Sequence, residues 1–177
     1  MGFLDRLSKA IDVLTGPETD DSVEKGHAFE KYVLNLFDKR SDFTLVSITS
    51  DYVGKSGHFA ESNMNPDMVL RCKKSKQEFA IECKFRSGLY WNAERRAHML
   101  QWSNPAQIRR YNEYQKKHSI PVFVIIGLSG SPNGPEYMFC IPLNEAKYTD
   151  LFESFLANFE RNPSKRFKWD SREKKLI

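Results

Sequence analysis

Residues 65–85 read NPDMVLRCKKSKQEFAIECKF, and the interpretation of the whole chain starts from this stretch. The apolar run 68–70 is followed by the polar segment 73–76 and then by the alternating segment 77–85. This order predicts two short strands joined by a turn. Side chains in a strand alternate between its faces, so the odd-numbered residues of the second strand form an apolar face. The opposite face carries Glu82 and Lys84.

Asp67 directly precedes the first of these strands. If the strands pair as a hairpin, Asp67 comes beside Glu82, with Lys84 about 6–7 Å further along the strand. Two carboxylates suit a hard divalent cation such as Mg²⁺, which activates a water and screens the charge of a phosphate. A lysine can orient that water or stabilise developing charge. The alternative is a solvated strand face on which Glu82 and Lys84 pair with each other, because such triples are common by chance.

Pro66-Asp67, fourteen residues, and then Glu82-Cys83-Lys84 resembles the signature of the PD-(D/E)xK nuclease superfamily. The resemblance covers roughly Val23–Leu143 and implies a restriction-endonuclease-like core. The branches it suggests are the nuclease-related domain and the type IV restriction or Holliday-junction-resolvase enzymes, and the pattern does not separate them. An aromatic-rich segment after Lys84 departs from the pattern and leaves the substrate open.

The segment Val23–Lys39 is predicted to be a helix with an apolar stripe, and Glu30 lies on or beside that stripe. A carboxylate in such a place needs a partner or a metal. The run from Gly26 to Glu30 resembles the first helix of the superfamily, whose glutamate lies beside the metal site. The alternative is an ordinary surface glutamate.

A second helix is predicted for Asn104–His118, with Asn104 as N-cap and a proline at the first helical position. Gln107, Tyr111 and Tyr114 share one face of it. This face resembles the glutamine–tyrosine helix of several nuclease branches of the superfamily. A half-exposed helix face without a special role is the alternative.

The remaining segments complete an α/β fold with a mixed central β-sheet flanked by α-helices. Further strands are predicted at 43–49, 121–128 and 137–143, and a closing helix at 144–161. Residues 1–22 form an amphipathic helix and linker, 23–161 the nuclease-like domain, and 162–177 a basic tail that touches nucleic acid or lies against the sheet. The aromatic residues of 86–102 either stack on unpaired bases, together with Arg95 and Arg96, or cover the end of the core.

Composition sets the class of protein. The 177 residues suit one domain, and 40% hydrophobic and 13% aromatic residues favour a globular chain over a disordered one. No apolar run reaches the length of a membrane span. Three cysteines without metal-ligand spacing favour a reduced, cytoplasmic protein. The net charge of +4 is compatible with a polyanionic partner, and composition leaves a homodimer open.

The resemblance therefore implies a Mg²⁺- or Mn²⁺-dependent endonuclease- or exonuclease-type hydrolase of DNA in repair, recombination or restriction, with RNA not distinguished from DNA. The alternative is a catalytically silent nucleic-acid-binding or protein-interaction module of the same fold. The expected catalytic residues are Glu30, Asp67, Glu82, Lys84 and Gln107. The expected metal ligands are Asp67, Glu82, the carbonyl of Cys83, and Glu30 directly or through water. The expected nucleic-acid contacts are Lys55, His58, Arg86, Arg109, Arg110 and Tyr111.

Overall fold

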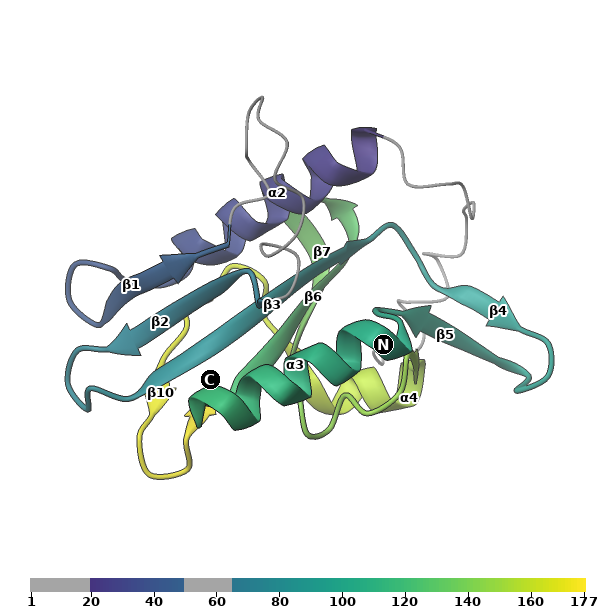
Figure 1. Ribbon diagram of the computed structural model, residues 1–177. Coiled ribbons are helices and arrows are strands. Elements are labelled where there is room, and N and C mark those ends of the chain that lie inside the picture. The colour runs from purple at the N-terminus through teal and green to yellow at the C-terminus, as the bar shows by residue number, and fades with distance from the viewer. Residues whose placement is uncertain (1–19, 50–64) are drawn as a thin grey trace.

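A computed structural model describes residues 20–49 and 65–177 (Figure 1). The predicted N-terminal amphipathic helix lies outside the described residues, as do Lys55 and His58. No helix among the described residues is long and apolar enough to cross a membrane.

A six-stranded sheet with the order β1-β2-β3-β6-β7-β9 forms the centre of the molecule. Two smaller sheets accompany it, β4-β5-β8 with three strands and β10-β11 with two. The helices are α2 (Asp20–Asn35), α3 (Pro105–His118), α4 (Glu153–Leu156) and the 3₁₀ helix η3 (Ala157–Phe159). The strands are β1 (Phe43–Ile48), β2 (Met68–Cys72), β3 (Glu78–Arg86), β4 (Tyr90–Asn92), β5 (Ala97–Gln101), β6 (Val122–Ser131), β7 (Gly134–Pro142), β8 (Asp150–Phe152), β9 (Glu160–Arg161), β10 (Trp169–Asp170) and β11 (Lys175–Leu176).

The central sheet is mixed, because β3 pairs with β6 in parallel while all the other neighbouring strands of this sheet pair antiparallel. The parallel pair is joined through α3, which is the connection that parallel strands require. The predicted hairpin is confirmed, since β2 and β3 pair antiparallel with Met68 opposite Ile81. The predicted α/β class, a mixed sheet flanked by helices, is confirmed as well.

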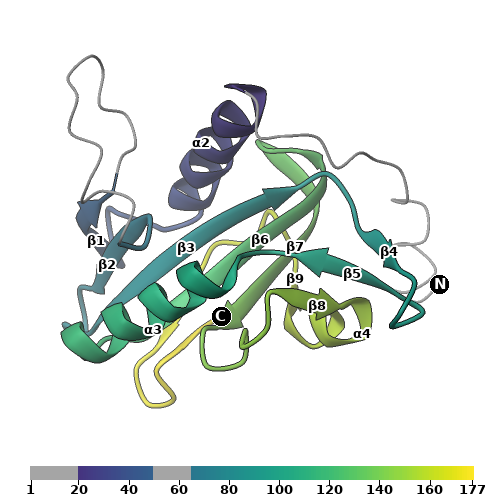
Figure 2. The ribbon, with the colours of Figure 1, turned by 45° about the vertical axis from the view of Figure 1, so that its right-hand side comes forward.

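The alternation of β3 divides the core into two layers (Figures 1 and 2). Phe79, Ile81 and Cys83 pack with α2, whose Phe29 and Val33 are fully buried. On the opposite face, Ala80 packs in a second cluster that includes Tyr111 of α3 and much of β6 and β7. Each long helix therefore covers one face of the sheet, and β3 carries side chains into both layers.

The C-terminal tail lies against the sheet, which was one of the two outcomes left open by the sequence. Phe167 is buried and stacks on Phe37, with ring centroids 4.6 Å apart. Trp169 stacks on Phe79 at 4.6 Å. These aromatic contacts make residues beyond 162 part of the α2 layer of the core.

The prediction of one closing helix at 144–161 is wrong. Residues 150–152 form β8, which is followed by the short helices α4 and η3 and by the strand β9. Trp102 explains the difference, because its backbone N–H donates to the Thr149 carbonyl at 3.0 Å and its indole N–H to the Tyr148 carbonyl at 2.7 Å. Pairing with β5 thus holds the segment extended, and tertiary contacts override its helical pattern.

Two further boundaries differ from the sequence prediction. The helix predicted for 23–39 begins at Asp20 and ends at Asn35. It ends early because the Asp38 carboxylate accepts hydrogen bonds from the backbone N–H groups of Arg40 at 3.0 Å and Ser41 at 3.3 Å, which closes a turn. The segment 86–102 contains the hairpin of β4 and β5, which the sequence left unassigned.

Gly127 provides a test of how tightly α2 packs on the sheet. A Cβ at this position would lie 2.5 Å from Cε2 of the fully buried Phe29 ring, so the ring or the strand would have to shift. We expect Gly127→Ala to lower the free energy of unfolding by about 1–3 kcal/mol, the usual effect of overpacking. Chemical denaturation measures it, and Phe29→Leu in the same chain should recover part of the loss.

Gly26→Ala is the matched control. This glycine is in α2, and no atom lies within 4 Å of its added Cβ. Alanine is the better helix former, so this variant should be as stable as the parent or slightly more stable. Equal losses in Gly26→Ala and Gly127→Ala would contradict the packing of Phe29 on Gly127.

Candidate active site

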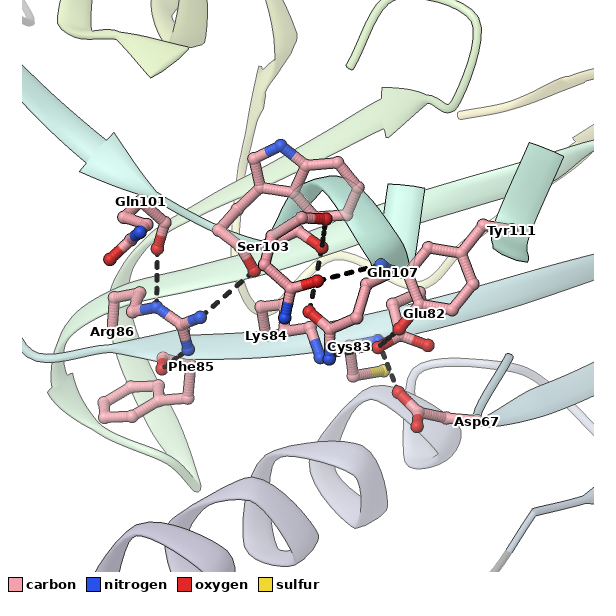
Figure 3. A network of polar contacts seen from close by, with 12 residues as sticks. Asp67, Glu82, Cys83, Lys84, Phe85, Arg86, Gln101, Ser103, Gln107 and Tyr111 are labelled. Carbon is pink, nitrogen blue, oxygen red and sulfur yellow. Dashed lines mark hydrogen bonds and ion pairs between the residues drawn. The ribbon is translucent and has the colours of Figure 1, made fainter. Parts of the chain in front are cut away.

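The hairpin brings Asp67 to Glu82, as the sequence predicts. Beyond the last ladder pair, Met68 with Ile81, the next residues of the two strands are Asp67 and Glu82. The backbone N–H of Cys83 donates to Oδ2 of Asp67 at 2.6 Å, which fixes that carboxylate against β3 (Figure 3). N–H and C=O of one strand residue point to the same side, so the Cys83 carbonyl also faces the Asp67 side, past the end of β2.

Glu82 is the centre of the polar network. The residue is only 2% exposed, and its Oε1 accepts two short hydrogen bonds. The hydroxyl of Tyr111 donates one at 2.6 Å, and the ammonium of Lys84 lies at 2.6 Å. The other oxygen, Oε2, is buried and has no hydrogen-bond partner among the described residues. Since buried carboxylate oxygens are rarely left without a partner, Oε2 is a candidate ligand atom.

The ionisable groups around Asp67 shift one another's pKa values. Burial, then the negative charges of Glu82 and Glu30, raise the pKa of Asp67 well above its ordinary value. Burial is the largest influence on Lys84 and lowers its pKa, but the charge and hydrogen bond of Glu82 together with the charge of Asp67 raise the pKa by more, and the net pKa is raised. Burial and the nearby Glu82 raise the pKa of Tyr111 as well, so its hydroxyl stays a donor. Among the described residues that influence Asp67, the Lys84 ammonium is set against the carboxylates of Glu82 and Glu30.

This donor set fits a hard divalent cation. No group of three or more His, Cys, Asp and Glu side chains in the described part of the chain is arranged to hold a metal ion. The set here is different, comprising the carboxylates of Asp67 and Glu82 and the backbone carbonyl of Cys83. Oxygen ligands of this kind suit Mg²⁺, which keeps several waters and needs only one or two carboxylates. The unpaired Oε2 and the raised pKa of Asp67 are both features that a cation would relieve.

Glu30 approaches the site from α2, on the other side of the sheet. Its charge contributes to the raised pKa of Asp67 and of Cys83, where burial is the largest cause for both. Its Oε2 lies 3.5 Å from Nδ1 of His27, one helical turn earlier. His27 belongs to the run that resembles the superfamily helix, but the sequence did not mark it as a candidate.

Gln107 occupies the first turn of α3, as predicted, and Asn104 caps the helix by accepting from its backbone N–H at 2.9 Å. Because α3 connects the parallel strands β3 and β6, it runs antiparallel to β3. Tyr111 is level with Glu82. Four residues back along a helix span about 6 Å, and two residues forward along a strand span about the same length. Gln107 is therefore level with Lys84, and Figure 3 draws both in one network.

Ser103 is the residue that sequence reasoning missed. It is 5% exposed, and its hydroxyl donates to Oε1 of Gln107 at 2.9 Å. One hydrogen bond to the carbonyl oxygen leaves the Nε2 amino group as the free end of the carboxamide. A serine directly before a helix N-cap is an unremarkable sequence feature, so only the fold reveals this contact.

The residues predicted to contact nucleic acid differ in how exposed they are and in what they already bond. The guanidinium of Arg86 donates to the carbonyls of Phe85 at 2.9 Å, Gln101 at 2.7 Å and Trp102 at 3.1 Å, which ties β5 to β3. Tyr111 is buried and its hydroxyl is committed to Glu82. Arg109 is exposed on α3, whereas Arg110 is half-buried with Nε lacking a hydrogen-bond partner among the described residues.

Comparison with known proteins finds no matching family model and no matching curated protein. Among solved structures, the chain is similar to a Holliday junction resolvase from the archaeal hyperthermophile Archaeoglobus fulgidus, with a TM-score of 0.49 and 15% sequence identity. The match covers 78% of this chain and 97% of that one. Because the identity is low and the TM-score is below 0.5, no residue role is carried over from that protein.

The raised pKa of Asp67 predicts a pH-dependent stability of the metal-free protein. Between the ordinary value of 3.8 and the raised value in the folded state, the folded protein binds more protons than the unfolded chain. Stability is therefore lost as pH rises through this window. Asp67→Asn keeps an oxygen that accepts from the Cys83 N–H but removes the charge. We expect it to raise Tm at neutral pH in the absence of metal, by about 2–4 °C for each kcal/mol of relieved repulsion.

Thermal unfolding with a chelator, at several pH values, measures this effect. Asp42→Asn is the matched control, because Asp42 is exposed on the surface and its removal should change Tm little. An Asp67→Asn protein that is less stable than the parent above the window would show that the carboxylates of the site do not repel one another.

Proposed function

We propose that this chain is a metal-dependent nuclease that hydrolyses phosphodiester bonds of DNA, with a PD-(D/E)xK-type site. The observation that carries the proposal is the state of Glu82. This glutamate is buried, bonded through one oxygen to Lys84 and Tyr111, and left with a second oxygen that has no partner among the described residues, beside Asp67. An ion pair with a purely structural role does not need a second buried carboxylate, that of Asp67, beside it, because burying another negative charge is destabilising.

Mg²⁺ or Mn²⁺ would be held by Asp67, by Oε2 of Glu82 and by the carbonyl of Cys83, with Glu30 nearby. When bound, the cation supplies a polarised water and charge screening for the phosphate. The protein's own contribution is to keep these ligands fixed before any substrate arrives. The Cys83 N–H holds Asp67, and the Tyr111 hydroxyl and Lys84 hold Glu82.

Lys84 is the group whose charge acts on the substrate. Its pKa is raised, because Glu82 and Asp67 together outweigh the effect of burial, so the side chain carries a positive charge at neutral pH. A charged ammonium cannot accept a proton. It therefore orients a water or stabilises the negative charge that grows on the phosphate, instead of serving as the general base.

Gln107 acts as a hydrogen-bond donor beside Lys84. Its Oε1 is occupied by the Ser103 hydroxyl, which leaves the two N–H groups of Nε2 for a phosphate oxygen. Ser103 is then a positioning residue, since it determines which end of the carboxamide faces the substrate. The helix N-terminus on which Gln107 lies also favours an anion.

Lys84→Ala tests the function. The variant should have a lower Tm, because the buried Glu82 loses its ion-pair partner, but it should still be folded at the assay temperature. Its single-turnover cleavage rate should fall by about two orders of magnitude, the usual effect of losing one preorganised electrostatic group. The measurement uses saturating Mg²⁺ or Mn²⁺ and a panel of single-stranded, duplex and branched DNA. Lys175→Ala is the control, because the Lys175 side chain is 64% exposed and its ammonium forms a surface ion pair with Glu173.

Equal cleavage rates for the parent and Lys84→Ala would remove Lys84 from the mechanism. If the parent cleaves no member of the panel with either metal, the nuclease proposal fails. The chain would then be assigned as a binding module that retains the fold.

Ser103 and Gln107 are tested by a double-mutant cycle. Ser103→Ala removes one hydrogen bond, so we expect a loss of about 2- to 10-fold in cleavage rate, corresponding to about 0.5–1.5 kcal/mol. Gln107→Ala should lose more. In the Gln107→Ala background, Ser103→Ala should have no further effect, because Ser103 acts only through Gln107. Gln107→Glu, which keeps the shape but cannot donate, should be as slow as Gln107→Ala.

Thermal unfolding of each variant separates positioning from stability. Additive rate losses in the double variant would mean that Ser103 influences cleavage by another route. A Gln107→Glu protein with the parent's rate would contradict the donor role of Nε2.

A further inference from the structure

The exposed aromatic side chains gather on one small sheet. Among the described residues, those at least 36% exposed are Tyr90, Trp91, Tyr148 and Phe152. The first two belong to β4, Phe152 to β8, and Tyr148 to the turn that enters β8. The strand register places Tyr90, Met99 and Phe152 on one face of this sheet and Trp91 on the other, because neighbouring residues of a strand point to opposite faces. Large aromatics are usually covered in a folded chain, and exposed ones that share a face mark an interaction site. We call the sheet β4-β5-β8 with Tyr148 the aromatic platform.

A cavity of about 770 Å³ opens on the aromatic platform. Tyr148, Phe152, Phe155 and Met99 form the apolar part of its wall, and Asn92 and Asp150 are among the polar groups. Its volume is in the range of pockets that take a small organic group such as a nucleobase.

The wall of this cavity is held by hydrogen bonds that do not involve a ligand. The Tyr90 hydroxyl donates to Asp150 at 2.5 Å, and the Thr149 hydroxyl donates to the same carboxylate at 2.6 Å. Trp102 holds the backbone of Tyr148 and Thr149 through its two N–H groups. A preformed wall lowers the entropy lost on binding.

The aromatic platform is directly connected to the candidate active site. Lys84 is followed two residues later by Arg86, whose guanidinium holds the Gln101 and Trp102 carbonyls at the end of β5. Ser103 and the helix that carries Gln107 come next. In Figures 1 and 2 the β4–β5 hairpin extends from the C-terminal end of β3, the end that carries Lys84 and Arg86. A strand whose phosphate lies at Lys84 would have neighbouring nucleotides near the platform.

The chemistry of the cavity selects a base over a phosphate. The carboxylates of Asp150 and Glu145 repel a phosphate. Both oxygens of Asp150 already accept hydrogen bonds from Tyr90 and Thr149, whereas Glu145 offers an acceptor to a base amino group. The aromatic rings offer faces for stacking, and Arg95 and Lys147, also in the wall, provide positive charge for the nucleic-acid backbone. In a duplex the faces of the bases are stacked inside and cannot reach such a wall.

We propose that the aromatic platform binds unpaired nucleotides, so that the preferred substrate is DNA with a single-stranded segment beside the bond that is cut. The assignment of the substrate rests on the proposed nuclease function. The binding itself does not, and it can be measured without cleavage. The occupant is an unpaired base of a nucleic acid, and a protein partner is the competing outcome.

Fluorescence anisotropy in the presence of a chelator tests the proposal, using a labelled 12-nucleotide single strand and a 12-base-pair duplex as probes. The single strand should bind more tightly than the duplex. Tyr148→Ala and Phe152→Ala should each weaken single-strand binding about 5- to 150-fold, the range that corresponds to about 1–3 kcal/mol per stacked base. Both variants should bind the duplex like the parent.

Tyr148→Phe is the matched control, since it keeps the ring and should keep the affinity. Ile48→Ala controls for an exposed apolar side chain away from the platform, because Ile48 is 48% exposed on β1. A parent protein without preference for the single strand overturns the proposal. Alanine variants with unchanged single-strand affinity overturn it too, and would assign the exposed aromatics to a protein partner.

Two measurements on the parent protein separate this proposal from the nuclease proposal: single-strand binding with a chelator and cleavage with metal. Normal single-strand binding by a chain that cleaves nothing would retain the platform and reject the nuclease. Cleavage with unchanged binding in Tyr148→Ala and Phe152→Ala would do the reverse.

Discussion

The buried carboxylate of Glu82 is the constraint on which the rest of the structure depends. A carboxylate that is 2% exposed is destabilising unless its oxygens are bonded. Lys84 and Tyr111 meet this need for Oε1 and so join a strand to the helix that packs on it. Oε2 receives no such bond from the described residues. The fold therefore stabilises Glu82 only in part, and under the proposed function Oε2 is the oxygen that would bind the cation.

Asp67 shows the same balance between stability and function. Its position is fixed by the Cys83 N–H, yet its charge is disfavoured by burial and by Glu82 and Glu30. Like-charged groups held close together are unfavourable in the absence of a cation and become favourable ligands in its presence. The groups around the site come from both layers of the core. Glu30 belongs to α2, and Tyr111, whose hydroxyl bonds to Glu82, belongs to α3 on the other face of the sheet.

Aromatic side chains have two separate uses in this chain. Phe79, Phe37 and Trp169 pack against one another within the α2 layer, and the stacking of Trp169 on Phe79 brings the C-terminal tail onto the sheet. Tyr148 and Phe152 remain exposed on a small sheet whose backbone is held by Trp102. Composition alone cannot separate these uses, because burial depends on which segments meet in the fold. The same limit explains why 144–161 was predicted as one helix although pairing with β5 holds part of it extended.

The sequence by itself determined the hairpin, the two faces of β3 and the meeting of Asp67 with Glu82. These features follow from local rules, since the strand period, the turn residues and the cap at Asn104 act over a few neighbouring positions. Only the tertiary structure decided that Tyr111 bonds to Glu82 instead of facing solvent, that Ser103 orients Gln107, and that Arg86 holds backbone carbonyls. The Tyr111 and Arg86 contacts join elements that are distant along the chain. From the sequence alone, each of the three side chains could have bonded to several different partners. Which partner each meets is set by the crossing of α3 over β3, a geometry that packing determines and sequence periodicity does not encode.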